Sequence, residues 1–300
     1  MNYIAPASLR PNDLVAVVAP ARVVNQKSVE EALEILQQWG LRVRTGDCLF
    51  NRHQMFAGAD EDRCRDLQWA LDDPEIKAVL CARGGYGTTR ILDSIDWQGF
   101  KENPKWICGF SDVTALLAHV HCLGIQSIHS TMPQLFDPKV HESDLNSLKA
   151  ILYHEEGMPL QAEYQQENQQ GRARGILIGG NLSLLVHIIG TSSELDTENK
   201  ILCIEEIDEY LYQVDRMMIQ LQRAGKLRNL AGVAVGHLTK MKEGELTFDK
   251  GAAGVIRSHL DPHIPVAFGL PFGHDKPNLA IPFGREGSLE ITSEGSELNF

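Results

Sequence analysis

The sequence has 300 residues, yet no two of its six cysteines are spaced as Cys-x-x-Cys. Three of them, Cys81, Cys108 and Cys203, lie within apolar runs, where a thiol behaves as a small hydrophobic side chain. The cysteine pattern therefore does not predict a disulfide framework, and it favours a reducing compartment.

Long apolar runs are also missing. No continuous apolar stretch approaches the roughly 20 residues that a helix needs to cross a bilayer. Residues 1–13 lack the basic-then-apolar layout of a signal peptide. We therefore expect a cytoplasmic protein that makes no contact with membranes.

Positive charge is scarce, because 28 lysines and arginines stand against 40 aspartates and glutamates, for a formal net charge of −12 at pH 7. This balance disfavours nucleic acid and anionic membrane surfaces as partners, and it leaves a small substrate open. Hydrophobic residues make up 43% of the chain, which is enough to bury a large core. The length suggests about two domains.

Apolar runs alternate with helical periodicity in the first half of the chain. Residues 14–19 are a continuous apolar run and residues 76–82 are apolar except for Lys77, as expected of strands buried in a parallel sheet. Residues 29–39 and 61–71 carry apolar side chains at helical spacing. This alternation predicts an α/β domain with a parallel sheet.

A polar stretch rich in Gln and Glu predicts a linker over residues 156–172. We therefore expect one domain over residues 1–155 and a second over residues 173–300. In the second domain, the glycines after the short strand at 176–178 are expected to permit close packing, and residues 279–300 alternate as strands and turns do.

The stretch 105–120 combines a strand and a helix around a candidate nucleophile. Residues 106–108 form a short apolar run, helical spacing begins at Val113, and Gly-Phe-Ser-Asp lies between them at 109–112. A sharp strand-to-helix turn at Gly-x-Ser exposes the serine hydroxyl and directs free backbone N–H groups toward it, as nucleophilic catalysis requires. Ser111 or Asp112 could instead cap the helix, because the second glycine of the Gly-x-Ser-x-Gly turn is absent.

Residues 83–87, Arg-Gly-Gly-Tyr-Gly, follow the predicted strand at 76–82. They match neither the Gly-x-Gly-x-x-Gly pattern nor the phosphate-binding P-loop, so a nucleotide cradle is disfavoured. Sites in open parallel sheets form at the carboxyl ends of strands, which favours an oxyanion donor here. A tight turn without chemistry is the alternative.

Neither the base nor its orienting carboxylate follows from composition, because the chain has eleven histidines. His119 and His121 are two residues apart and would face different sides of a helix, so a shared metal is not predicted. His237 and His274 both end apolar runs, and the residues alone do not choose between them. Glu205 directly follows the apolar run 201–204, where a buried carboxylate needs a partner.

Four segments in this order resemble the LD-carboxypeptidases, a family of serine peptidases. The resemblance covers nearly the whole chain. It is carried by residues 83–87 (Arg-Gly-Gly-Tyr-Gly), 109–112 (Gly-Phe-Ser-Asp), 204–216 (from Ile-Glu-Glu to Tyr-Gln-Val-Asp-Arg) and 273–274 (Gly-His). Residues 57–63 and 179–182 resemble further segments of the family.

The resemblance implies a Ser-His-Glu triad without a metal or an organic cofactor. Ser111 would be the nucleophile, His274 the base and then the acid, and Glu205 the orienting carboxylate. The backbone N–H groups of Gly85 and Asp112 would form the oxyanion hole.

The fold implied is a Rossmann-like N-terminal domain with a parallel sheet, which carries the nucleophile, and a smaller β-rich C-terminal domain, which carries Glu205 and His274. The activity implied is removal of the terminal D-alanine from cytoplasmic murein tetrapeptides during peptidoglycan recycling, by a homodimer. One alternative is a microcin-immunity type of hydrolase that cleaves peptidyl-nucleotides. Another is a noncatalytic protein that binds a ligand at the glycine-rich turn.

The chain departs from the family pattern at loops that are expected to line the cleft. Ala21-Arg22 follow Pro20 where the family often has serines, Ser130 stands where glycine is usual, and Tyr210-Leu211 replace a common Pro-Pro. These departures leave the details of the substrate open.

Overall fold

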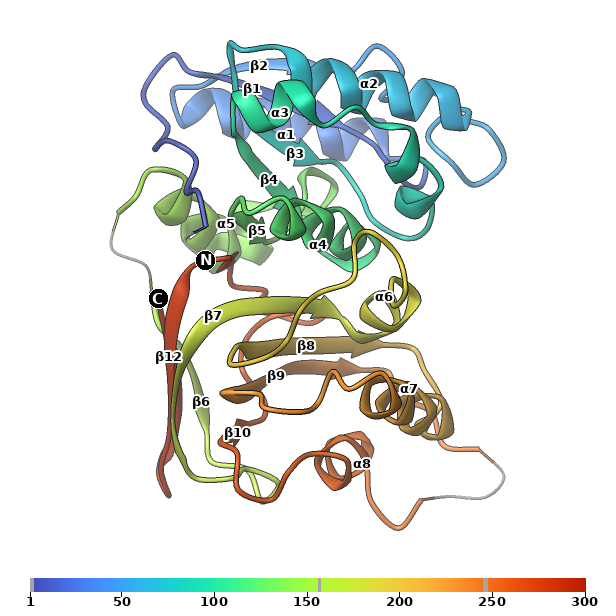
Figure 1. The fold of residues 1–300 in the computed structure, drawn as a ribbon. Coiled ribbons are helices and arrows are strands. Elements are labelled where there is room, and N and C mark those ends of the chain that lie inside the picture. The colour runs from blue at the N-terminus through green and yellow to red at the C-terminus, as the bar shows by residue number, and fades with distance from the viewer. Residues whose placement is uncertain (1–2, 156–157, 245–247) are drawn as a thin grey trace.

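The computed structural model describes residues 3–155, 158–244 and 248–300. The chain forms two β-sheets, each accompanied by helices, which occupy the upper and lower halves of the molecule in Figure 1. Residues 156 and 157 of the predicted linker lie outside the described residues. Across the described ranges, no helix is both long enough and apolar enough to cross a membrane.

The first sheet has six strands in the order β11-β5-β4-β3-β1-β2. The pairings are parallel except that β11 runs antiparallel to β5. The strands are β1 (Leu14–Val18), β2 (Arg42–Thr45), β3 (Ile76–Cys81), β4 (Trp106–Gly109), β5 (Ser127–His129) and β11 (Ile281–Phe283). The predicted α/β domain with a parallel sheet is confirmed.

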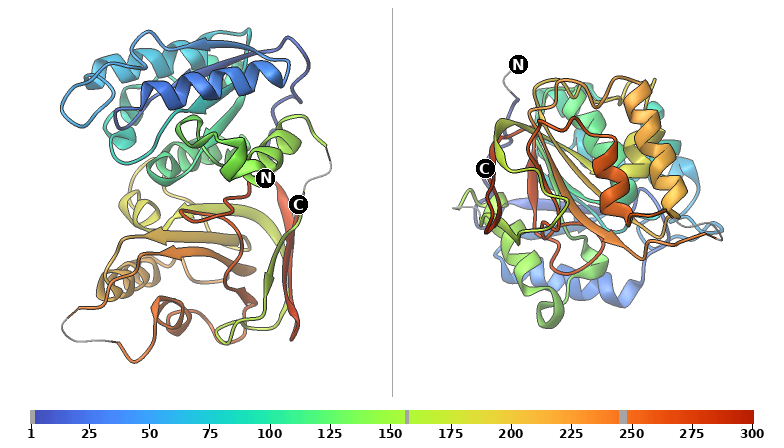
Figure 2. Two further views of the ribbon diagram at one scale, coloured as in Figure 1. Left: turned by 180° about the vertical axis from the view of Figure 1, so that it is seen from behind. Right: turned by 90° about the horizontal axis from the view of Figure 1, so that it is seen from below.

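Helices cover both faces of this sheet. One face packs against α1 (Gln26–Gln38) and α5 (Pro138–Leu152), and the other against α2 (Asp60–Asp72) and α4 (Thr114–Cys122). Seen from behind, α1 (blue) and α5 (green) lie in front of the sheet (Figure 2). Shorter helices complete this half: η1 (Thr88–Arg90), η2 (Leu92–Ser94), α3 (Gln98–Glu102), η3 (Ser111–Val113) and η4 (Pro133–Leu135).

The second sheet has seven strands in the order β10-β9-β8-β7-β12-β13-β6. Its long strand β7 pairs antiparallel with β12 along its first half and parallel with β8 along its second half. The strands are β6 (Leu160–Glu163), β7 (Gly171–Asn181), β8 (Ile201–Ile207), β9 (Gly232–Thr239), β10 (Val266–Ala267), β12 (Glu286–Ile291) and β13 (Gly295–Asn299), and the helices are α6 (Leu182–His187), α7 (Leu211–Arg223) and α8 (Ala252–Ser258). This strand-rich sheet agrees with the expected C-terminal domain.

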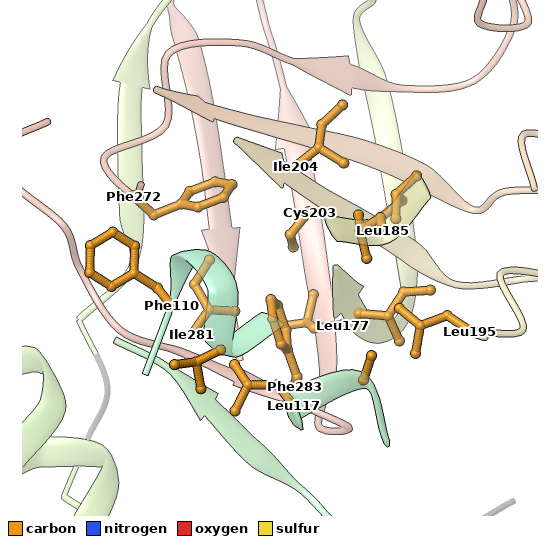
Figure 3. Close-up of a cluster of buried hydrophobic side chains, with 14 of the residues drawn as sticks. Phe110, Leu117, Leu177, Leu185, Leu195, Cys203, Ile204, Phe272, Ile281 and Phe283 are labelled. Carbon is orange, nitrogen blue, oxygen red and sulfur yellow. The ribbon is translucent and has the colours of Figure 1, made fainter. Parts of the chain in front are cut away.

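Helix α4 lies between the two sheets and is buried along almost its whole length. A helix that is apolar all round must be buried on every side. Its Leu117 belongs to one apolar cluster with Leu177 of β7 and Phe283 of β11, and Figure 3 shows these side chains packed together near Phe110. The helix that follows Ser111 is therefore fixed by the cores of both halves.

Close packing around β7 depends on two glycines, of which Gly180 faces α4 and Gly179 faces β8. A Cβ atom on Gly180 would come within 2.5 Å of the Thr114 side chain, and one on Gly179 would come within 1.8 Å of the Cys203 carbonyl oxygen. Both glycines also have positive φ, 132° for Gly180 and 140° for Gly179. The expectation that these glycines permit close packing is confirmed.

Candidate active site

Ser111 lies where β4 turns into η3 and α4. Its φ is 62°, in the left-handed region that residues other than glycine rarely adopt. Such backbone strain persists where the surrounding structure fixes it, often at functional sites. The side chain is partly exposed at the carboxyl end of β4, as the Gly-x-Ser pattern predicts.

His274 lies between Ser111 and Glu205. Its Nε2 is 3.0 Å from the Ser111 Oγ, and its Nδ1 is 2.6 Å from the Glu205 Oε2. Glu205 is completely buried in β8, whereas Ser111 follows a strand of the first sheet. The structure thus brings together three side chains that are 163 and 69 residues apart in the chain.

Two neighbours fix the position of His274. Gly273 has a φ of 114°, and a Cβ atom there would come within 2.8 Å of the Glu205 Cβ, so only glycine fits without displacement. On the other side, the Phe110 ring packs against the imidazole with 4.8 Å between the ring centroids. These contacts hold the imidazole in one place between its two partners.

Glu206 lies next to Glu205 and has a different role. Its carboxylate accepts hydrogen bonds from the Asn181 side chain (2.9 Å), from the Ser183 backbone N–H and hydroxyl (2.7 Å each) and from the Ile207 backbone N–H (2.8 Å). Burial raises the pKa of Glu206 despite these donors. Glu206 therefore connects β8 to the start of α6, and none of these hydrogen bonds is to His274.

His237, the alternative candidate for the base, supports the loop that carries His274. The backbone N–H of Asp275 donates to the His237 Nδ1 over 3.2 Å. Burial lowers the pKa of His237, which favours the neutral ring that can accept this bond.

The Gly84–Gly85 turn lies against Ser111. A Cβ atom on Gly84 would be 2.9 Å from the Ser111 Cβ and 3.3 Å from the Asp112 backbone nitrogen, so any side chain there would fill the space beside the nucleophile. Among the described residues, the backbone N–H groups of Gly85 and Asp112 donate to no protein acceptor. Both groups are therefore available to a ligand.

The side chain of Asp112 joins this turn to η3. Its Oδ2 accepts a hydrogen bond from the Thr88 backbone N–H over 2.8 Å. Burial raises the pKa of Asp112, while the Thr88 hydrogen bonds and the Arg63 charge oppose that rise. The carboxylate therefore fixes the distance between the glycine turn and the start of α4.

Arg63 is a supporting residue that the sequence analysis did not identify. Its side chain is fully buried and donates to the carbonyl oxygens of Pro20 and Gly87 and to Asp60. These contacts hold the turn after β3 at Gly87, next to the residue that Asp112 binds. The available signal was the Asp60-x-x-Arg63 spacing, which places an acid and a base on one face of a helix.

His129 is a second residue that the sequence analysis did not assign. It is completely buried at the end of β5, among the rings of Phe110, Phe272 and Phe283. Burial lowers its pKa to about 4, so the ring is neutral near pH 7. His129 thus places an uncharged ring near His274 and Glu205.

His119 and His121 contact different neighbours, as their spacing predicts. The His119 Nδ1 is 2.9 Å from the Ser193 Oγ, whereas His121 stacks on Tyr3 with 4.2 Å between centroids. In residues 3–155, 158–244 and 248–300, no group of three or more His, Cys, Asp or Glu residues is placed to hold a metal ion.

The chain matches models of both domains of one protein family. Residues 15–130 match the LD-carboxypeptidase N-terminal domain, and residues 174–289 match the LD-carboxypeptidase C-terminal domain. A probable murein peptide carboxypeptidase of Bacillus subtilis is 35% identical over 305 residues, which cover 98% of this chain and 93% of that protein.

Solved structures agree with this family. A muramoyltetrapeptide carboxypeptidase from Oxalobacter formigenes superposes with a TM-score of 0.85 at 30% identity, over 95% of this chain and 97% of that one. The structure of MccF in complex with glutamyl sulfamoyl guanosine also superposes with a TM-score of 0.85, over 100% of this chain and 99% of that one. Its identity is 19%, so that likeness concerns the fold alone.

Proposed function

The chain belongs to the LD-carboxypeptidase family of serine peptidases, and we propose that it removes the terminal D-alanine from murein tetrapeptides with a Ser111–His274–Glu205 triad. The substrate class is supported by the names of the Bacillus subtilis relative and of the Oxalobacter formigenes structure. The observation that carries the triad is the pair of contacts of His274, 3.0 Å to the Ser111 Oγ and 2.6 Å to the Glu205 Oε2. A base between a hydroxyl and a buried carboxylate is the geometry of an activated serine.

In the first step, the Ser111 oxygen attacks the carbonyl carbon before the terminal D-alanine while His274 Nε2 takes the hydroxyl proton. Glu205 accepts the Nδ1–H, which fixes the tautomer that leaves Nε2 free and stabilises the imidazolium. The charge on the carbonyl oxygen is held by the backbone N–H groups of Gly85 and Asp112. Each such donor contributes about 3–4 kcal/mol in comparable sites.

In the second step, the imidazolium of His274 protonates the leaving nitrogen and the carbon–nitrogen bond breaks. D-Alanine departs, and the shortened peptide stays attached to Ser111 as an ester. Water then attacks the ester carbonyl, with His274 taking its proton. The ester bond breaks, the proton returns to Ser111, and the product leaves with a new terminal carboxylate.

Turnover of a synthetic murein tetrapeptide tests this function. We expect mass spectrometry to detect free D-alanine and the tripeptide with the unchanged protein. Ser111→Ala should reduce the rate by at least 10³-fold, because the nucleophile is gone. Ser288→Ala is the matched control, since Ser288 is exposed on β12 and takes no part in the site.

The two alternatives predict other outcomes of the same assay. A peptidyl-nucleotide hydrolase would release product from a peptidyl-nucleotide conjugate and none from the tetrapeptide. A noncatalytic binding protein would bind the tetrapeptide without releasing D-alanine. Either result would contradict the proposed carboxypeptidase.

We also propose that the protein acts in the cytoplasm as a homodimer. The six cysteines are all free thiols, which supports a reducing compartment. Light scattering coupled to size-exclusion chromatography should give twice the chain mass of 33.3 kDa, and a mass of one chain would contradict the dimer.

A further inference from the structure

Arg22 lies directly over the glycine turn beside the nucleophile. A Cβ atom on Gly85 would come within 2.0 Å of the Arg22 Cδ and 2.6 Å of its Cγ, so the arginine side chain runs across the α-carbon of Gly85. Gly84, the preceding residue, faces Ser111 in the same way. One short turn therefore has the nucleophile on one side and a guanidinium-bearing side chain on the other.

The backbone of Arg22 is held by two loops. Its N–H donates to the Gly84 carbonyl oxygen over 3.4 Å, and it forms an isolated antiparallel bridge with Phe56. Ala21, the residue before it, is completely buried. The base of the side chain is thus fixed, which lowers the entropy lost when the side chain binds a ligand.

The charge of Arg22 has no acidic partner in the described parts of the chain. Within residues 3–155, 158–244 and 248–300, neither Arg22 nor Arg83 forms a salt bridge, and of the two guanidinium groups only that of Arg83 donates a hydrogen bond, to the Val23 carbonyl oxygen over 2.5 Å. Burial, and then repulsion from Arg22, lower the pKa of Arg83. Arg22 and Arg83 therefore form a local positive region in a chain whose net charge is −12.

A carboxypeptidase must accommodate a negative charge close to its nucleophile. The terminal carboxylate of the substrate is separated from the bond that breaks by one tetrahedral carbon, so it lies about 3–4 Å from the attacked carbonyl carbon. An exopeptidase must also distinguish this charged end from a chain that continues. A guanidinium can bind a carboxylate through two parallel hydrogen bonds, which an uncharged amide cannot match.

We propose that Arg22 binds the carboxylate of the terminal D-amino acid, with Arg83 adding positive potential, and that it is the specificity-determining residue for a free C-terminus. This inference rests on the proposed carboxypeptidase function. It concerns a residue in which the chain departs from the family pattern, since serines are common there in the resemblance described above.

The test compares a murein tetrapeptide ending in D-alanine with the same peptide ending in D-alaninamide. For the unchanged protein we expect kcat/KM to be about 10–100 times higher for the acid than for the amide, from a charge-assisted pair. Arg22→Gln should reduce kcat/KM for the acid about 10–100-fold, mainly by raising KM. It should change the value for the amide by less than about threefold, so that the preference disappears.

Two further variants make the outcome specific. Arg22→Lys keeps the positive charge but lacks the planar guanidinium that can donate two parallel hydrogen bonds. This variant should retain part of the preference for the acid. Arg10→Gln removes an exposed arginine before the start of β1 and should leave the preference unchanged.

If Arg22→Gln keeps both the KM for the acid and the acid-to-amide ratio of kcat/KM, the inference about Arg22 is wrong while the proposed carboxypeptidase function stands. If the unchanged protein releases no D-alanine from the acid, the proposed function itself fails.

Discussion

At the scale of single residues, the adjacent carboxylates Glu205 and Glu206 show how one strand supplies two different roles. Successive side chains of a strand point to opposite sides, so only one of the two can reach His274. Glu205 does so, over 2.6 Å, while Glu206 accepts four hydrogen bonds from Asn181, Ser183 and Ile207. The sequence places a carboxylate at the end of this strand but does not choose between the two without the resemblance to the family.

Exchanging each carboxylate for its amide should separate these roles. Glu205→Gln should lower kcat about 10²–10⁴-fold with little change in KM, because the amide favours the wrong imidazole tautomer. Glu206→Gln should keep kcat within about tenfold and destabilise the protein by about 1–3 kcal/mol, because one of its buried donors loses a partner. Steady-state kinetics and urea unfolding of both variants measure the two effects. An equal loss of kcat in both would contradict the assignment.

His121 should make stability depend on pH. Both ring nitrogens are buried and make no hydrogen bond in the described structure, and burial lowers the pKa from 6.5 to about 4. Between these values the unfolded chain binds the proton and the folded chain does not. Stability is therefore fully present above about pH 6.5 and is lost as the pH falls toward 4, by up to about 3 kcal/mol.

The matched comparison for this prediction is His121→Phe, which keeps the stack on Tyr3 and cannot be protonated. Urea unfolding at pH 7 and pH 5 should show a smaller loss of stability for the variant than for the unchanged protein. The prediction would be wrong if both lost the same free energy of unfolding over this interval.

At the scale of elements, the site depends on one strand–turn–helix unit and on the glycine turn packed against it. The unit itself follows from the sequence, because the apolar run at 106–108 and the helical spacing from Val113 locate Ser111 between them. The support around it does not follow, because contacts such as those of Arg63 with Pro20 and Gly87 join segments that are far apart in the chain. Local patterns determine elements, whereas such contacts depend on how the elements are packed.

Gly84→Ala tests the role of the glycine turn. The added methyl group would meet the Ser111 side chain and the Asp112 backbone nitrogen, so we expect kcat/KM to fall at least 100-fold, about the effect of one lost oxyanion donor. The thermal midpoint should change by only a few degrees, because the φ of Gly84 is not positive.

Gly251→Ala is the control for this substitution. Nothing lies within 4 Å of a Cβ atom at that position, and its φ is −64°. It should keep both the activity and the thermal midpoint. If Gly84→Ala were as active as Gly251→Ala, the turn would not contribute the oxyanion donors.

At the scale of the whole molecule, the two halves share one apolar core. The cluster that contains Leu117 of α4 also contains β7, β8 and β9, and β11 leaves the second half to complete the first sheet. The sequence predicts most of the strands and helices, yet it does not predict this exchange, because the short run 281–283 does not identify its partner. It also gives no signal for β6, an edge strand within the predicted linker, whose residues are mostly polar.

The shared core predicts that the two halves unfold together. All four tryptophans lie in the first half, so their fluorescence follows that half, while far-ultraviolet circular dichroism follows both. We expect the two urea transitions to coincide. Leu117→Ala should shift both by the same amount, for a loss of about 2–5 kcal/mol. Two separate transitions would mean that the halves fold independently.

The central claim is that His274, from the second half of the chain, activates Ser111, from the first. The most direct measurement is the rate at which a fluorophosphonate labels the protein, with the labelled residue located by peptide mass spectrometry. We predict one label on Ser111, formed at least 100-fold more slowly in His274→Gln. Labelling of another residue, or an equal rate in His274→Gln, would contradict the account.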